Sequence, residues 1–135
     1  MNSQKTLNET EIRGSLDAAR VLYDELHALD HEESWALYLT STNRPIAVEM
    51  ITCGTLKSTL MDHRRVVKKA ILCDAAGVIL YHNHPSGEPQ PSTADIQETE
   101  KLRNACSLFD ISLLDHIIIS NKCFFSFADE SKNNF

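Results

Sequence analysis

The segment AGVILYHNHPSGEPQPSTAD, residues 76–95, limits the fold more than any other part of the sequence. Its first eight residues, 76–83, have strand length and are apolar as far as Tyr81, which is typical of a buried strand. Pro85 lacks a backbone N–H and ends the strand, and Gly87 permits a tight reversal of the chain. A helix is predicted to follow over about 93–108. The segment therefore predicts a strand, a loop and a helix in succession, with polar side chains gathered where the strand ends.

Periodic patterns predict the other elements. Apolar residues recur at helical spacing from about Glu11 to Leu29, and Asp62 can cap a second helix, HRRVVKKAIL. Two hairpins are predicted from the segments SWALYLT (34–40), IAVEMIT (46–52), SLLDHIIIS (112–120) and KCFFSF (122–127). The order of elements is αββαβαββ, which indicates an α/β fold with a mixed β-sheet flanked by helices.

Length and composition limit the class of protein. The 135 residues, 42% hydrophobic and 24% charged, fit a single domain overall. We expect residues 1–30 to form an N-terminal helical segment that packs on a domain of residues 31–135. The sequence has no apolar run long enough for a membrane span and no signal-peptide pattern, so it predicts a cytoplasmic protein. The net charge of −6 argues against a surface built mainly to bind nucleic acid.

The four cysteines, Cys53, Cys73, Cys106 and Cys123, are widely spaced and form no C-x-x-C pair. They lie mostly in apolar stretches, where cysteine behaves as a small hydrophobic residue. We therefore expect reduced core thiols rather than a disulfide framework or a zinc site built from cysteines.

Two histidines, His82 and His84, lie at the end of the predicted strand. Side chains alternate along a strand, so both project from one face with backbones about 6.6 Å apart, and both imidazoles can converge on one ion. The loop returns the chain to Ser92 and Asp95 at the helix start, which makes Asp95 the third ligand candidate. Two histidines and one carboxylate leave an open position on a tetrahedral zinc, as catalytic sites do. A capping box would explain Ser92 and Asp95, but not the histidine pair.

The spacing of these polar residues resembles a known signature. H-x-H, seven residues, S, two residues and D is the metal-binding signature of the JAMM (MPN-type) metallopeptidases, and His82, His84, Ser92 and Asp95 match each position. Four segments resemble the RadC family more narrowly: HNHPSG (82–87), CGTL (53–56), LLDHIII (113–119) and the closing SF (126–127). The resemblance covers roughly residues 31–128. It implies a core related to the cytidine-deaminase fold, with Zn²⁺ held by both histidines and the aspartate.

The resemblance also implies a glutamate general base on an early strand, just before an aromatic or apolar run. The segment HEESWALYL supplies Glu32 and Glu33. Strand alternation places Glu33 on the face of Trp35 and the other bulky residues, and Glu32 on the face of Ser34. A carboxylate on the bulky face is costly unless it has a function there, so this phase favours Glu33 over a solvated position before the strand. Glu49, on the next strand, is the reserve candidate.

The implied activity is zinc-dependent hydrolysis of a peptide or isopeptide bond. Glu33 would accept the proton of a zinc-activated water and pass it to the leaving amine, and Ser92 would hydrogen-bond the developing oxyanion. Asp115 and His116 are adjacent strand residues that face opposite ways, so at most one of them reaches the site. We expect His116 to support the site or the fold without being a ligand.

The same residues fit other functions less well. The string 82–84 spells HNH, but HNH nucleases spread those residues along a ββα unit. Zinc deaminases need H-x-E and P-C-x-x-C, and the sequence has neither. The basic group in 63–69 could contact nucleic acid, although a solvated helix face explains it more simply. The remaining alternative is a RadC-type DNA repair or mobile-element module that binds DNA or a protein partner without peptidase activity.

Overall fold

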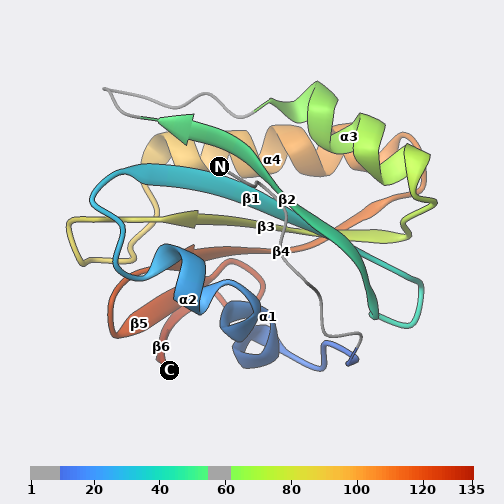
Figure 1. The fold of residues 1–135 in the computed structure, drawn as a ribbon. Helices are drawn as coiled ribbons and strands as arrows, with labels where there is room; N and C mark the ends of the chain where they lie inside the picture. The colour runs from blue at the N-terminus through green and yellow to red at the C-terminus, as the bar shows by residue number, and fades with distance from the viewer. Residues whose placement is uncertain (1–9, 55–61) are drawn as a thin grey trace.

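In the computed structural model, the described residues, 10–54 and 62–135, form a six-stranded sheet with helices on both faces (Figure 1). The strands are β1 (Glu32–Leu39), β2 (Pro45–Gly54), β3 (Gly77–Asn83), β4 (Ser112–Ile119), β5 (Cys123–Ser126) and β6 (Ser131–Asn134). The helices are α1 (Ser15–Val21), α2 (Tyr23–Leu26), α3 (His63–Leu72) and α4 (Thr93–Ser107). The strand order is β2-β1-β3-β4-β5-β6, with β3 and β4 parallel and the other neighbours antiparallel. The predicted α/β fold with a mixed, helix-flanked sheet is confirmed.

Different helices cover the two faces of the sheet. Helices α1 and α2 lie on one face, and α3 and α4 lie on the other (Figure 1). Side chains alternate along β1, so Trp35, Leu37 and Leu39 enter the core beneath α1 and α2, whereas Ala36 and Tyr38 enter the core beneath α3 and α4. Strand β1 is therefore buried on both sides.

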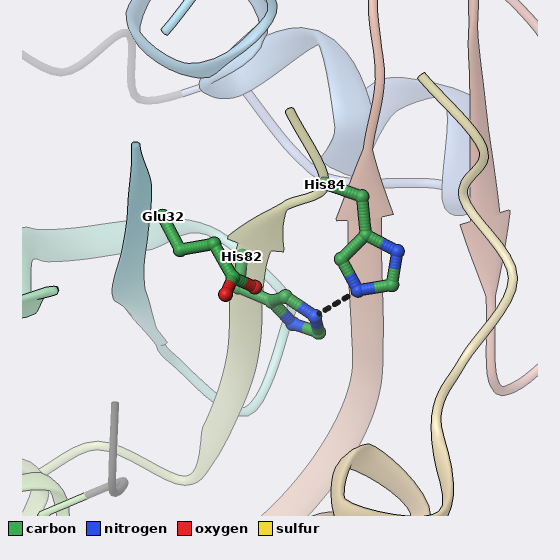
Figure 2. A group of neighbouring side chains, drawn as sticks. All are labelled: Glu32, His82 and His84. Atoms are coloured by element: carbon green, nitrogen blue, oxygen red, sulfur yellow. Dashed lines mark hydrogen bonds between the residues drawn. The ribbon is translucent and has the colours of Figure 1, made fainter. Parts of the chain in front are cut away.

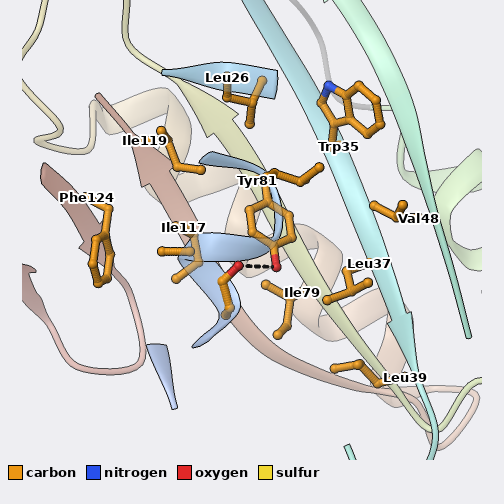
Figure 3. Packing of buried hydrophobic residues seen from close by; sticks show 13 residues of the cluster. Leu26, Trp35, Leu37, Leu39, Val48, Ile79, Tyr81, Ile117, Ile119 and Phe124 are labelled. Carbon is orange, nitrogen blue, oxygen red and sulfur yellow. Dashed lines mark hydrogen bonds between the residues drawn. The ribbon is translucent and has the colours of Figure 1, made fainter. Parts of the chain in front are cut away.

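The core beneath α1 and α2 anchors the middle of the sheet (Figure 3). Tyr81 of β3 is fully buried there, and its hydroxyl donates a hydrogen bond to the backbone carbonyl of Ala18 at 2.8 Å. Leu22 and Leu26 are buried beside it, and each such side chain contributes about 1.5–3 kcal/mol to stability. This packing holds β3, which carries His82 and leads directly into His84.

The unit β3–α4–β4 brings the histidine segment to the start of a helix. Because β3 and β4 are parallel, α4 must carry the chain back along the sheet, and its N-terminus lies near the end of β3. The backbone N–H of His84 donates to the carbonyl of Ile119 at 3.0 Å, which extends the pairing with β4 beyond the last residue of β3. The histidines thus leave the sheet in a defined direction.

Some expected elements differ in detail. The single helix predicted from Glu11 to Leu29 is two short helices, interrupted at Leu22, whose φ of −119° and ψ of 14° are not helical. This break accompanies full burial of Leu22 and Leu26, whereas Leu16 is left partly exposed. Tertiary packing therefore overrides the uniform helical spacing of the apolar residues.

Strand β6 was not predicted, because SKNN has neither β-branched residues nor an apolar alternation. It pairs with β5 through the backbone, and such pairing depends little on side-chain polarity.

In α3, Asp62 caps the helix as expected, and Val66 and Ala70 form the buried face. Ile71, which was expected on that face, is 49% exposed.

The described thiols of Cys73, Cys106 and Cys123 are free, in agreement with the sequence. The side chain of Cys53 and the last two residues of CGTL, 55 and 56, lie outside the described residues. Of the helices in the described part of the chain, none has the length and apolar character needed to cross a bilayer.

Candidate metal centre

The histidines at the end of β3 converge, as strand alternation predicts. His82 is 8% exposed, and its Nε2 lies 2.9 Å from Nε2 of His84. The two rings are 4.8 Å apart, centre to centre, and are inclined at 60°. Figure 2 shows both imidazoles turned toward a common point beside the sheet.

Asp95 completes this group from the first turn of α4. Its Oδ1 lies 3.3 Å from Nε2 of His82, and its Oδ2 lies 3.3 Å from Nε2 of His84. Ser92 forms a capping box with Asp95: the Ser92 hydroxyl accepts from the Asp95 N–H at 3.0 Å, and the Ser92 N–H donates to Oδ2 at 2.8 Å. The capping box therefore aims the Asp95 carboxylate at the histidines.

The Nδ1 atoms of the two histidines point away from the common centre. Nδ1 of His84 lies 2.9 Å from the carbonyl oxygen of Glu88. A carbonyl can only accept, so Nδ1 carries the proton and Nε2 of a neutral His84 has a lone pair. Nδ1 of His82 lies 2.7 Å from Nε2 of the buried His116.

Glu32 is the carboxylate of β1 that faces the histidines (Figure 2). Its carboxylate and the ring nitrogens of His82 and His84 all lie within 4.8 Å of one another. The register explains this, because Ser34 of β1 lies opposite His82, and Glu32 is two residues away on the same face.

The expectation that Glu33 faces the site is wrong. The Glu33 carboxylate lies on the other face, where it accepts from Nε1 of Trp35 at 3.0 Å and lies 2.8 Å from Nε2 of His31. Glu33 does share a face with Trp35, but the sheet is covered on both sides, and His82 lies on the other face, the one that carries Ser34. The sequence alone does not contain the register between β1 and β3 that separates the two glutamates.

Asn83 is a residue that the sequence analysis missed. It lies between His82 and His84 in the sequence, and its buried side chain points to β1. Its Oδ1 accepts from the N–H of Glu33 at 2.7 Å, and its Nδ2 donates to the carbonyl of His31 at 2.8 Å. These bonds hold the backbone on both sides of Glu32, and therefore connect the glutamate to the histidine strand.

The reserve candidate, Glu49, lies elsewhere. It pairs with Ala36 across β1 and β2, about 13 Å along the strand from Glu32. Its carboxylate accepts from the hydroxyl of Tyr38 at 3.4 Å and lies 3.9 Å from the guanidinium of Arg65. The structure therefore does not bring Glu49 to the histidines.

Asp115 and His116 face opposite sides of β4, as predicted. Asp115 accepts from the hydroxyl of Ser126 at 2.7 Å and from the N–H of Ala128 at 3.0 Å, so it holds the chain after β5. His116 contacts His82 directly, and its Nδ1 lies 2.5 Å from the hydroxyl of Thr99 in α4.

Comparison with known proteins shows the family of the chain. A RadC-like JAB domain matches residues 12–132 of the chain. The chain belongs to the RadC-like JAB domain family. It is 38% identical over 128 residues to a UPF0758 protein of Flavobacterium johnsoniae, covering 95% of this chain and 56% of the relative. It is 44% identical over 115 residues to a UPF0758 protein of Desulforudis audaxviator, covering 85% and 50%.

The chain thus spans about half the length of the curated relatives that it matches. The match of the RadC-like JAB domain includes β1, β3 and the start of α4, which carry the polar cluster. The resemblance drawn from the H-x-H, S and D spacing is confirmed at the level of the family.

Electrostatics in this RadC-like JAB domain favour a positive charge on His84 beside the ionised Asp95. Burial opposes ionisation of Asp95, but hydrogen bonding with His82 and His84 outweighs it, so the pKa of Asp95 is lowered. Burial likewise opposes protonation of His84, but Asp95 outweighs it and the pKa of His84 is raised. Burial holds the pKa of His116 well below its ordinary value.

The donor atoms fit a zinc ion. Two ligands at 2.0–2.1 Å from a tetrahedral zinc are about 3.3–3.4 Å apart. The separations in this RadC-like JAB domain are 2.9 Å between the Nε2 atoms and 3.3 Å from each Nε2 to Asp95. Each Asp95 oxygen lies at this ligand spacing from one of the two histidines, so Asp95 can serve as the third ligand. Glu32 is then available for proton transfer.

Proposed function

We propose that this chain is a zinc-dependent hydrolase of the metallopeptidase or isopeptidase type. The observation that carries the proposal is the convergence of His82, His84 and Asp95 at 2.9–3.3 Å, with the Glu32 carboxylate beside them. Three protein ligands leave a fourth position open, which is the arrangement of catalytic rather than structural zinc sites. Membership of the RadC-like JAB domain family supports the proposal.

When bound, zinc would supply Lewis acidity at this position and lower the pKa of a coordinated water to about 7. The two histidines and Asp95 would hold the ion. Glu32, on the same face of the sheet, takes the proton from the attacking water and returns it to the leaving amine. Asn83 holds the backbone beside Glu32, which limits the positions that its carboxylate can take.

Ser92 has a position suited to binding the developing oxyanion. Its hydroxyl oxygen already accepts from the Asp95 N–H, so its orientation is limited while its own proton remains to be donated. The residue is exposed at the start of α4, next to the carboxylate ligand. A hydrogen bond to negative charge that develops in the transition state lowers the barrier more than one made in the ground state.

The proposal is tested by removing and restoring the metal. The purified protein is stripped with a chelator, reloaded with zinc and assayed against panels of peptide and isopeptide substrates. We expect hydrolysis that disappears on stripping and returns with zinc. Glu32→Gln should bind zinc but lose hydrolysis.

A hydrolytic activity that survives both chelation and Glu32→Gln would contradict the proposal. So would a protein that is inert toward both panels and instead binds DNA with a strong salt dependence or binds a protein partner without cleaving it. Those outcomes would support a non-peptidase binding module instead.

A further inference from the structure

A chain of buried hydrogen bonds leads away from the metal-facing side of His82. Nδ1 of His82 lies 2.7 Å from Nε2 of His116, and Nδ1 of His116 lies 2.5 Å from Oγ1 of Thr99. The Thr99 hydroxyl donates to the backbone carbonyl of Asp95 at 2.6 Å. His116 and Thr99 are 2% and 1% exposed, so water does not compete for these bonds.

The last bond of the chain sets the direction of the others. A hydroxyl has a single proton, and that of Thr99 is used on the Asp95 carbonyl, which can only accept. Thr99 Oγ1 must therefore accept from His116, so Nδ1 of His116 carries a proton. The direction is thus determined by a backbone carbonyl that cannot reverse its role.

The same logic continues to His82. The His116 ring is buried and stacks on Phe127 with centroids 4.6 Å apart. A positive charge on this ring would be poorly solvated, so His116 is neutral. A neutral His116 with a proton on Nδ1 has a lone pair on Nε2. That lone pair accepts from Nδ1 of His82, which leaves the lone pair of His82 on Nε2, facing His84 and Asp95.

We propose that Thr99 and His116 are positioning residues that hold His82 in the tautomer with its proton on Nδ1. This inference rests on the proposed zinc site, because that tautomer is the one that presents Nε2 as a metal ligand. Helix α4 supplies two parts of the arrangement. The Asp95 carboxylate lies beside Nε2 of His82, and the Asp95 backbone carbonyl orients Thr99. Without the Thr99 hydroxyl, His116 can adopt its other tautomer and donate to His82, which would place a proton on Nε2 of His82.

The test uses a matched pair of variants. Thr99→Val removes the hydroxyl with little change in shape, and Thr99→Ser keeps it. Zinc affinity is measured by competition with a chromophoric chelator, and thermal unfolding of the zinc-free proteins verifies the fold. We expect Thr99→Val to weaken zinc binding about 10- to 100-fold, the usual effect of losing a partner of a ligating histidine, and Thr99→Ser to stay near wild type.

A second measurement needs no variant. Two-bond ¹H–¹⁵N NMR of the wild-type imidazoles, without and with zinc, assigns the protonated nitrogen of His116 and His82. We expect the proton of His116 on Nδ1 in both states, and the proton of His82 on Nδ1 in the zinc-loaded protein.

A proton on Nε2 of neutral His116 would overturn the inference, and so would equal zinc affinities for Thr99→Val and Thr99→Ser. Because the tautomer of His116 is also read in the zinc-free protein, this failure is distinct from that of the proposed function. The proposed zinc site fails instead if the wild type does not bind zinc.

Discussion

Glu32 and Glu33 are neighbours in β1, but their carboxylates lie on opposite faces of the sheet. Glu32 faces His82 and His84, whereas Glu33 is buried against Trp35 and His31. The two residues are of the same type but differ in burial and in the face from which they project. They therefore provide a matched pair for testing which carboxylate transfers protons.

Glu32→Gln should retain zinc and fold normally but lose hydrolysis by about 10²- to 10⁴-fold, because an amide has the shape of the acid without its basicity. Glu33→Gln should change the rate little and instead lower the free energy of unfolding by about 1–2 kcal/mol through its contacts with His31 and Trp35. Steady-state rates, bound zinc and urea unfolding of both variants separate these effects. Loss of zinc in Glu32→Gln would show that Glu32 is a ligand rather than the base.

The purified protein should contain about one zinc per chain, and His84→Ala or Asp95→Asn should remove most of it. Asparagine at position 95 can still accept from the Ser92 N–H, so the helix cap is kept while the anionic ligand is lost. His27→Ala is the control, since His27 stacks on Tyr23 away from the cluster. Metal analysis after gel filtration measures occupancy, and full occupancy in both site variants would refute the ligand assignment.

Asn83→Ala should destabilise the fold and impair catalysis together. It leaves the Glu33 N–H and the His31 carbonyl without their buried partner, which costs about 2 kcal/mol or more. It also frees the backbone beside Glu32, so the turnover rate should fall while zinc is retained. Asn104→Ala, at an exposed position of α4, serves as the control. Wild-type turnover in a correctly folded Asn83→Ala would show that this side chain is only structural.

Asp115 should make stability fall as the pH rises above about 4. Burial raises the pKa of Asp115 above its ordinary 3.8, although hydrogen bonds from Ala128 and Ser126 oppose the shift. The folded state then binds the proton more tightly than the unfolded state, so this contribution is complete below 3.8 and is lost as the pH rises through the folded pKa.

Asp115→Asn removes this titration. In urea unfolding between pH 4 and 6, the wild type should lose stability relative to Asp115→Asn, with a difference in slope of up to about 1.4 kcal/mol per pH unit. Parallel curves for the two proteins would contradict the raised pKa.

Cys106 should resist thiol reagents in the folded protein. It is fully buried, and burial raises its pKa to about 11, so its thiolate fraction at pH 8 is about one in a thousand. Cys73 is more accessible than Cys106 and should react before it. Mass spectrometry after brief iodoacetamide treatment, with and without urea, locates the label. Rapid native labelling of Cys106 would show that the α3–α4 side of the core opens readily.

Local patterns were sufficient to predict much of this protein. The apolar run before His82, the Pro and Gly after His84, and the capping pattern of Ser92 and Asp95 depend on neighbours in the sequence. Strand alternation and helix capping act over two to four residues, so they can be read without knowing the fold. The convergence of the two histidines and the placement of Asp95 at the helix start followed from these short-range rules.

Tertiary structure decided which partners meet across the sheet. The register that places Ser34 opposite His82 determines that Glu32, rather than Glu33, faces the histidines. A shift of one residue would exchange the two, and no local property of HEESWALYL distinguishes those registers. The contacts of Asn83 with β1 and of His116 with Thr99 likewise join segments that are distant in sequence. Their formation depends on long-range packing of the whole sheet against its helices, which short-range periodicity does not encode.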